Sequence, residues 1–233
     1  MANKSTKPKK QSTAAALYLR AYNLIQVFGW SYIFFLLVQH DFSTSTVNLW
    51  HNVKWPIIIF QHAALLEVVH AILGLVSSNP VLTTFQVLSR VMVVTGVLLA
   101  TPESYAASSF GLPLAVTAWS ITEIIRYLYY FMSLISFVPF ILTWLRYTLF
   151  IILYPIGITG ELLCLYAATK YASSHPDAWS HMLPNSWNFT FNYLYLLIIV
   201  MMSYIPIFPQ LYLHMFAQRR KVLGKSDSSK KAQ

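Results

Sequence analysis

The sequence predicts an all-α integral membrane protein, a bundle of about six transmembrane helices with both termini in the cytosol. Of its 233 residues, 57% are hydrophobic and only 10% are charged, whereas roughly 25% are charged in an ordinary soluble domain. Apolar stretches long enough to cross a bilayer recur along the chain. Eleven of the sixteen Lys and Arg residues lie at the two ends, in residues 1–20 and 219–233, beside a single acid, Asp227.

Six apolar stretches are candidates for membrane spans. A hydrocarbon core about 30 Å thick needs roughly 20 apolar residues in a helix, and the stretches lack the ten-residue alternation of membrane β-strands. The third stretch is short, and apolar residues also follow the fourth, so five or seven spans remain possible. In chain order the predicted spans are Tyr18–Val38, Trp55–Val76, Leu82–Ala100, Leu112–Ser133, Arg146–Ala168 and Phe191–Phe216.

The boundaries of these spans follow from the residues around them. The first span has no small-residue cleavage site after it, so we expect it to stay in the mature protein rather than to act as a signal peptide. Turn residues separate the second span from the third at Ser77–Pro80 and the third from the fourth at Thr101–Glu103. Pro139 precedes the fifth span, and no connection is long enough for a soluble domain.

The charge distribution predicts the orientation and the domains. Basic residues accumulate on the cytosolic side of membrane proteins, so both tails are expected there and the number of spans is expected to be even. The predicted domains are a cytosolic tail at 1–17, a transmembrane catalytic domain at 18–216 and a cytosolic tail at 217–233. A basic surface on a folded face is missing, which argues against nucleic-acid binding. The one cysteine, Cys164, excludes an internal disulfide and a cysteine zinc cluster.

Ionisable residues inside the predicted spans are candidates for functional or paired roles, because each costs at least about 2.5 kcal/mol at the centre of a bilayer. We expect Glu123 and Arg126 to pair within one helix, and Glu67 to pair with His70 or Arg90. His62 is expected to form a hydrogen bond between helices. Arg146 lies at a predicted cytosolic boundary, where its side chain is expected to extend toward water.

Glu161 differs from these residues because it has no cation within four residues along its own helix. It lies about 22 Å into its span by helical rise, so it needs either a partner from elsewhere or a chemical purpose. Tyr154 precedes it by seven residues, about two turns, and therefore lies on the same helix face. Pro155 and Gly160 between them favour a kink and a close helix approach. This spacing alone is also compatible with a core tyrosine and a structural carboxylate.

A carboxylate and a phenol on one helix face fit a β-elimination of water. The carboxylate takes a proton as a base, and the phenol donates one to the departing oxygen. The histidines are scattered without metal-ligand spacing, so we expect no metal. The absence of a GxGxxG pattern or a phosphate-binding loop with its lysine argues against nucleotide and hydride chemistry, and no cofactor is expected.

Five segments resemble the 3-hydroxyacyl-CoA dehydratase family, earlier named protein tyrosine phosphatase-like. They are QVLSRVMVV (86–94), TEIIRYLYYF (122–131), LRYTLFIILYPIGITGELL (145–163), PNSWNFTFNY (184–193) and SYIPIFPQLYLHM (203–215), and the resemblance extends over residues 18–222.

The resemblance implies a multi-pass enzyme of the endoplasmic reticulum membrane. It would remove water from a long-chain or very-long-chain (3R)-3-hydroxyacyl-CoA to give the trans-2-enoyl-CoA, the third step of the fatty acid elongation cycle. Its partners would be this substrate, the bilayer and other elongation-cycle enzymes. The resemblance implies that Tyr154 and Glu161 are catalytic, without showing which is the acid and which the base. It implies supporting roles for Glu67, Gln86, Arg90, Glu123 and Arg126.

Two other functions are compatible with buried charges in a helical bundle. A transporter or channel would use them as a pathway, and it would favour inverted repeats, of which the chain shows none. A non-catalytic scaffold of the endoplasmic reticulum membrane would tolerate the loss of Tyr154 or Glu161. Phosphatase chemistry is disfavoured, because Cys164 lies in an apolar segment and no arginine or glycine follows it closely.

The chain carries three further sequence patterns that are typical of targeting or glycosylation. Lys230 and Lys231 stand fourth and third from the C-terminus and resemble a dilysine retrieval signal. Asn188-Phe189-Thr190 matches the glycosylation triplet, but it adjoins the sixth span, so we expect little or no glycan there. Asn3-Lys4-Ser5 is expected to be unmodified because it lies in the cytosolic tail.

Overall fold

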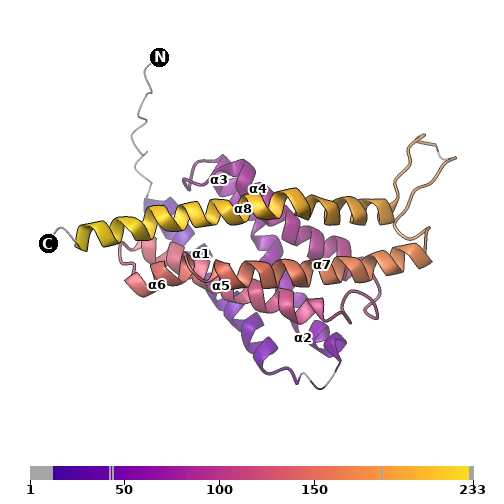
Figure 1. The fold of residues 1–233 in the computed structure, drawn as a ribbon, viewed down its shortest axis with the longest axis horizontal. Helices are drawn as coiled ribbons and strands as arrows, with labels where there is room; N and C mark the ends of the chain where they lie inside the picture. The colour runs from indigo at the N-terminus through magenta and orange to yellow at the C-terminus, as the bar shows by residue number, and fades with distance from the viewer. Residues whose placement is uncertain (1–12, 42, 44, 185, 231–233) are drawn as a thin grey trace, which may run out of the picture.

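The computed structural model describes residues 13–41, 43, 45–184 and 186–230, and the part so described is almost wholly helical (Figure 1). A single bridge between His181 and Phe191 is the only β-pairing in those ranges. The helices, in chain order, are α1 (Thr13–Val38), α2 (Thr46–Ala63), α3 (Leu65–Ile72), α4 (Pro80–Val93), the π-helix η1 (Val94–Leu99), α5 (Gly111–Leu134), α6 (Phe140–Arg146), α7 (Phe150–Ser174) and α8 (Tyr193–Lys230).

The predicted all-α membrane fold is confirmed. Among the described residues, five helical segments are long and apolar enough to cross a membrane, and they are Thr13–Val38, Thr46–Ile72, Pro80–Leu99, Phe140–Ser174 and Tyr193–Gly224. The remaining predicted span corresponds to α5, whose 24 residues reach about 36 Å at the helical rise. It is less apolar than the other five because it carries Glu123 and Arg126.

Four boundaries differ from the predictions. The predicted second span starts at Trp55, but α2 begins nine residues earlier, at Thr46. The second span is interrupted at Ala64, which separates the last residue of α2, Ala63, from the first residue of α3, Leu65. The apolar stretch before the fifth span forms the short helix α6, which begins directly after Pro139 and leads into α7. The last helix extends to Lys230, well beyond the predicted end at Phe216, although Pro206 and Pro209 lie inside it. Lys231 and residues 1–12, with Asn3, lie outside the described residues.

The starts of α2 and α4 are set by local capping. The Ser45 side chain accepts a hydrogen bond from the Val47 amide at 3.2 Å. The Asn79 side chain accepts one from the Val81 amide at 2.9 Å, and Pro80 occupies the first helical turn. Both residues satisfy amides that have no partner within the helix. These polar caps explain why the short connections end where they do.

The core is built around α5, which packs against α1 on one side and α7 on the other. Trp30, Trp119 and Tyr127 are among its large, fully buried side chains. The close approach of α5 and α7 depends on glycine, because a Cβ at Gly160 would lie 2.5 Å from the Ala115 amide nitrogen. This approach brings the α7 face that carries Glu161 against α5.

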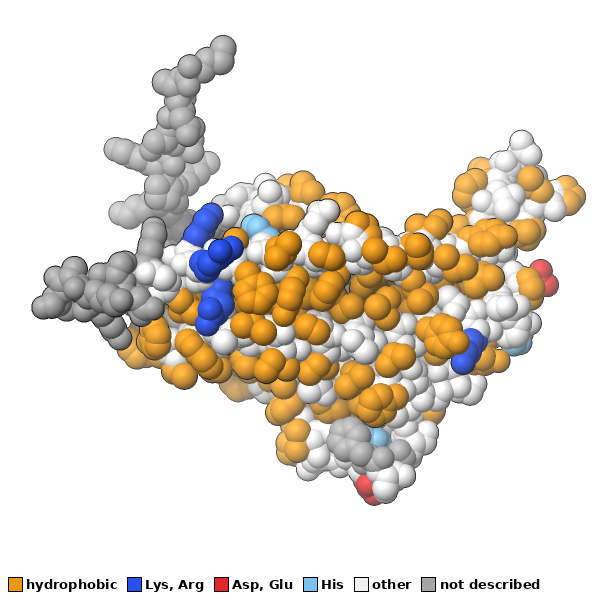
Figure 2. All heavy atoms as spheres, viewed as in Figure 1, with side chains coloured by type: hydrophobic (Ala, Val, Ile, Leu, Met, Phe, Trp, Pro, Cys, Tyr) orange, Lys and Arg blue, Asp and Glu red, His pale blue; other side chains and the backbone are white. Residues whose placement is uncertain are grey.

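The outer surface is strongly apolar. Hydrophobic side chains cover much of the face in Figure 2, including the length of α8, while Lys and Arg gather near its C-terminal part. Large side chains such as Phe28, Trp55 and Ile199 are each about two-thirds exposed. Surfaces of this composition are stable against lipid rather than water. The first turns of α1 lie at the same end of the bundle as α6 and the later part of α8 (Figure 1).

Candidate active site

Glu161 and Tyr154 both lie on α7, which continues as one helix through Pro155. Glu161 is buried, with 7% of its surface exposed, and Tyr154 is half-buried. Pro155 cannot donate a backbone hydrogen bond, and the Thr159 hydroxyl donates to its carbonyl oxygen at 2.8 Å. The helix therefore keeps the two-turn spacing that places both side chains on one face.

The Glu161 carboxylate has a hydrogen-bond donor on each oxygen. The Trp119 indole Nε1 of α5 donates to Oε1 at 2.8 Å, and the Tyr204 hydroxyl of α8 donates to Oε2 at 2.8 Å. The prediction that this deep carboxylate takes a partner from another helix is confirmed. Both hydrogen-bond donors are uncharged, and Glu161 forms no ion pair with any residue that the structure describes.

The Tyr154 ring stacks against α8. It lies nearly parallel to the Phe208 ring, with centroids 5.2 Å apart, and to the Tyr212 ring, with centroids 5.8 Å apart. Within the described residues the Tyr154 hydroxyl makes no hydrogen bond. Tyr204, Phe208 and Tyr212 follow one another at intervals of four residues and share one face of α8. One face of α8 therefore contacts both Tyr154 and Glu161.

A second cluster of charges joins α3, α4 and α5. The Arg126 guanidinium donates to Glu67 Oε1 at 2.8 Å and to Glu123 Oε2 at 2.7 Å. Arg90 donates to Glu123, and the Tyr127 hydroxyl donates to Glu67. Two carboxylates thus face two guanidinium groups, and the cluster has no formal net charge. We call these five residues the arginine cluster.

The arginine cluster agrees with some of the predicted pairings and corrects others. The expected pair of Glu123 and Arg126 within α5 is confirmed. The expected pairing of Glu67 with His70 or Arg90 is wrong, because Arg126 reaches Glu67 from α5. His70 instead forms a hydrogen bond with the Tyr18 hydroxyl at 2.9 Å. The guanidinium of Arg126 is long enough to reach from α5 to Glu67 on α3, and its several donors let it contact Glu67 and Glu123 at once.

Three other predicted residues have different surroundings. His62 forms the expected bond between helices, from its Nε2 to the Thr95 hydroxyl at 2.9 Å. Arg146 does not extend toward water: it packs over the Tyr130 ring at 4.5 Å and donates to the Tyr130 hydroxyl at 3.1 Å. Gln86 is exposed on α4 and does not join the arginine cluster.

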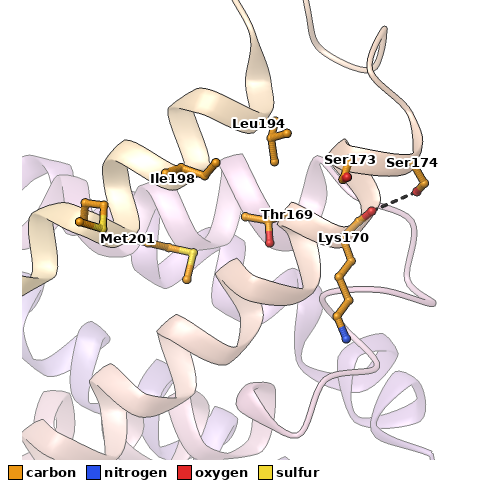
Figure 3. A pocket seen from close by; sticks show the side chains of 8 residues that line it. Thr169, Lys170, Ser173, Ser174, Leu194, Ile198 and Met201 are labelled. Carbon is orange, nitrogen blue, oxygen red and sulfur yellow. Dashed lines mark hydrogen bonds between the residues drawn. The ribbon is translucent and has the colours of Figure 1, made fainter.

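An open groove lies between the C-terminal part of α7 and the N-terminal part of α8 (Figure 3). Its volume is about 610 Å³. Thr169, the lining residue of α7 nearest to Glu161 in sequence, is eight residues further along the helix, about 12 Å at the helical rise. The groove is therefore separate from the Tyr154 hydroxyl and the Glu161 carboxylate. It is lined by Thr169, Lys170, Ser173, Ser174, Leu194, Ile198, Met201 and Met202.

Sequence reasoning missed Trp119 and Tyr204. Tyr204 lies within a segment that carries the family resemblance, and Trp119 lies three residues before another. A tryptophan or tyrosine in a membrane span is, however, most simply explained by packing or by an interfacial position. The predicted depth of Glu161 in its span was a usable signal, because a buried carboxylate needs hydrogen-bond donors. Sequence spacing gives no way to select those donors from the fifteen tyrosines and seven tryptophans of the chain.

Comparisons with known proteins agree with this architecture. A sequence model of the family described as "Protein tyrosine phosphatase-like protein, PTPLA" matches residues 61–225. Very-long-chain (3R)-3-hydroxyacyl-CoA dehydratase 2 of Mus musculus is 45% identical over 97% of this chain and 88% of its own length.

Similar proteins are found in two other organisms. Very-long-chain (3R)-3-hydroxyacyl-CoA dehydratase hpo-8 of Caenorhabditis elegans is 44% identical over 91% of this chain and 97% of its own length. The dehydratase PASTICCINO 2 of Arabidopsis thaliana is 36% identical over 92% of this chain and 96% of its own length. No solved structure shows significant similarity. The chain belongs to the protein tyrosine phosphatase-like family, among whose members are these very-long-chain (3R)-3-hydroxyacyl-CoA dehydratases.

Proposed function

We propose that this protein is a dehydratase that removes water from long-chain and very-long-chain (3R)-3-hydroxyacyl-CoA and releases the trans-2-enoyl-CoA. The names of its relatives support the reaction class. The observation that carries the proposal is the face of α7, where two side chains lie two turns apart. One is a buried carboxylate held by two neutral donors, and the other is a phenol whose hydroxyl has no hydrogen bond among the described residues. This arrangement matches the two proton transfers of a β-elimination.

The proposed reaction uses Glu161 as the base. Its carboxylate takes a proton from C2 of the substrate, which the neighbouring thioester makes acidic. The electron pair of the C2–H bond forms the double bond between C2 and C3. The C3–O bond breaks, and Tyr154 donates its proton so that the hydroxyl leaves as water. The proton on Glu161 then returns to the Tyr154 oxygen through solvent, so the protein is unchanged after one turnover.

Two donors on the carboxylate favour this assignment over the reverse one. Trp119 and Tyr204 each donate a hydrogen bond to a Glu161 oxygen, and an ionised carboxylate, the form that a base requires, accepts hydrogen bonds on both oxygens. Among the described residues the Tyr154 hydroxyl has no hydrogen-bond partner, so it can donate to a substrate oxygen. A reversed mechanism would need an ionised Tyr154 phenol, and no described cation forms a hydrogen bond to that hydroxyl.

The phosphatase-like name of the family does not fit this site. A cysteine phosphatase needs an accessible thiolate beside a loop that holds phosphate. Cys164 is fully buried in the core. It lies three residues after Glu161 on α7, in the apolar contact between α7 and the rest of the bundle.

The proposed location is the endoplasmic reticulum membrane, with both tails in the cytosol. The apolar surface and the five span-length helices support a multi-pass protein. The basic residues at both ends support a common cytosolic side. The CoA head would then remain in water near the basic tails, while the acyl chain enters the bundle toward Tyr154. Other enzymes of the elongation cycle are the expected protein partners.

Turnover by the purified protein in detergent or nanodiscs tests the proposal. We expect wild type to convert 3-hydroxystearoyl-CoA to the enoyl product. Tyr154→Phe and Glu161→Gln each remove one proton-transfer group and are expected to lower kcat on the order of 10²-fold or more. Size-exclusion profiles should match wild type. Tyr166→Phe, on the exposed side of α7, and Glu103→Gln, whose carboxylate pairs with Lys54 of α2, are matched controls that should keep full activity.

Normal turnover by folded Glu161→Gln protein would overturn the assignment of the base. Wild type that binds the substrate but never releases enoyl product would instead favour a non-catalytic role. Detection of the product by mass spectrometry separates these outcomes, because binding alone leaves the substrate mass unchanged.

A further inference from the structure

We propose that Trp119 and Tyr204 are positioning residues for Glu161, and that they direct the abstracted proton to the carboxylate oxygen that faces Tyr204. The inference rests on the proposed function. It starts from the two donors that hold the carboxylate, one from α5 and one from α8, each at 2.8 Å. Neither donor is a residue that the family resemblance assigns to the site.

The two donors differ in what they do once Glu161 is protonated. An indole N–H only donates, whereas a phenol hydroxyl both donates and accepts. Trp119 therefore occupies the same lone pair of Oε1 before and after the proton transfer. The Tyr204 hydroxyl can rotate and accept a hydrogen bond from a proton on Oε2. The protonated carboxyl of Glu161 therefore keeps its hydrogen bonds to both Trp119 and Tyr204 only when the proton is on Oε2, the oxygen that faces Tyr204.

The position of Tyr204 on α8 links the two catalytic side chains. Phe208 follows Tyr204 by one turn and Tyr212 follows by two turns, and both rings stack on Tyr154. The same face of α8 therefore holds the plane of the Tyr154 ring and one oxygen of Glu161. Both catalytic side chains belong to α7, so their contacts with one face of α8 orient the two side chains relative to each other.

A purely structural role for Tyr204 predicts different behaviour. In that case its hydroxyl would only satisfy a buried acceptor, as the Tyr193 hydroxyl does toward the Gly96 carbonyl oxygen. Both tyrosines are on α8, and both donate to a group on another helix. Tyr193 donates at a distance from the reacting groups, so Tyr193→Phe serves as the matched control for the loss of a buried phenol hydroxyl.

The test measures kcat and KM of Tyr204→Phe, Trp119→Phe and Tyr193→Phe with 3-hydroxystearoyl-CoA. We expect Tyr204→Phe to lower kcat by about 10 to 10²-fold, with KM within about two-fold of wild type, because misplacing a reacting group acts on the chemical step. Trp119→Phe should lower kcat by a smaller factor, since Trp119 need not reverse its hydrogen bond. Substrate deuterated at C2 should show a larger isotope effect in Tyr204→Phe than in wild type.

An infrared measurement tests the contacts independently of turnover. The carboxylate band of Glu161, identified by its loss in Glu161→Gln, should shift in Trp119→Phe and Tyr204→Phe and stay in place in Tyr193→Phe. An unchanged band together with unchanged kcat in Tyr204→Phe would overturn the positioning role. Failure of wild type to form enoyl product would contradict the dehydratase function instead, while a shifted band would still support the two contacts.

Discussion

Two groups of buried carboxylates share this bundle, and they are held in opposite ways. Glu67 and Glu123 face the guanidinium groups of Arg90 and Arg126 in the arginine cluster. Glu161 is held on α7 by two neutral donors, an indole and a phenol. The first group is neutralised by opposite charge. The second is held by hydrogen bonds from neutral groups and forms no ion pair among the described residues, although Arg90 interacts with it electrostatically.

This difference separates a structural group from a reactive one. A proton added to Glu123 would leave guanidinium charges unpaired in a buried site, which is strongly unfavourable. A proton added to Glu161 leaves its two hydrogen-bond donors, Trp119 and Tyr204, neutral, and it breaks no ion pair among the described residues. A carboxylate that must gain and lose a proton in every turnover is therefore better served by the surroundings of Glu161. The arginine cluster is suited to clamp α3, α4 and α5 in one arrangement.

The largest expected effect on stability comes from breaking the arginine cluster. Arg126→Leu removes the guanidinium that contacts both Glu67 and Glu123, and it leaves one arginine for two carboxylates. We expect the free energy of unfolding to fall by about 3–5 kcal/mol, as when one partner of a buried ion pair is lost. Thermal unfolding in detergent, followed by size exclusion, measures the change.

Lys170→Leu is the control for Arg126→Leu, because Lys170 is exposed and lies over the Tyr166 ring. It should leave the midpoint of unfolding nearly unchanged. A wild-type midpoint in Arg126→Leu would show that the arginine cluster does not clamp the helices.

A smaller effect is expected where α5 and α7 meet. An alanine Cβ at Gly160 would lie 2.5 Å from the Ala115 nitrogen and 2.7 Å from the Gly111 carbonyl oxygen. Gly160→Ala should therefore force the helices apart and lower the free energy of unfolding by about 1–3 kcal/mol. Because Trp119 of α5 contacts Glu161 of α7, activity should also fall, by more than the unfolded fraction explains.

Gly224→Ala, near the end of α8, is the matched substitution for Gly160→Ala. A Cβ there meets nothing within 4 Å, and it should change neither stability nor activity. If Gly160→Ala and Gly224→Ala had the same stability and activity, the close approach of α5 and α7 at Gly160 would not matter for either property.

The smallest expected effect on stability belongs to Glu161→Gln. The amide oxygen can still accept one of the two hydrogen bonds and no ion pair of the described residues is broken, so the free energy of unfolding should change by about 1 kcal/mol or less. Glu123→Gln, by contrast, leaves Arg90 and Arg126 with one carboxylate between them. It should be clearly more destabilising in the same thermal assay. Equal destabilisation by the two variants would remove the distinction between the two groups.

Much of the architecture is visible in the sequence because each signal is local. Apolar stretches of span length predict the long helices, and Ser45 and Asn79 mark helix starts through their own side chains. The pairing of Glu123 with Arg126 follows from their three-residue spacing on one helix. The shared face of Tyr154 and Glu161 follows from the helical repeat in the same way.

The contacts between helices could not be predicted in this manner. The arginine side chains reach across the bundle, so the partner of Glu67 depends on where α5 lies relative to α3. Arg146 lies among tyrosine rings because α6 folds back beside the end of α5, which brings Tyr130 within reach. Neither arrangement has a signature in spacing along the chain.

The sequence by itself determined the class of the protein, the approximate spans and the presence of one deep carboxylate two turns from a tyrosine. These properties depend on composition and on the period of a single helix. Only the tertiary structure decided that Trp119 and Tyr204 hold Glu161, and that Phe208 and Tyr212 stack on Tyr154. Those contacts join residues about forty to sixty positions apart, and their geometry depends on how closely α5, α7 and α8 approach, which Gly160 and the surrounding side chains set together.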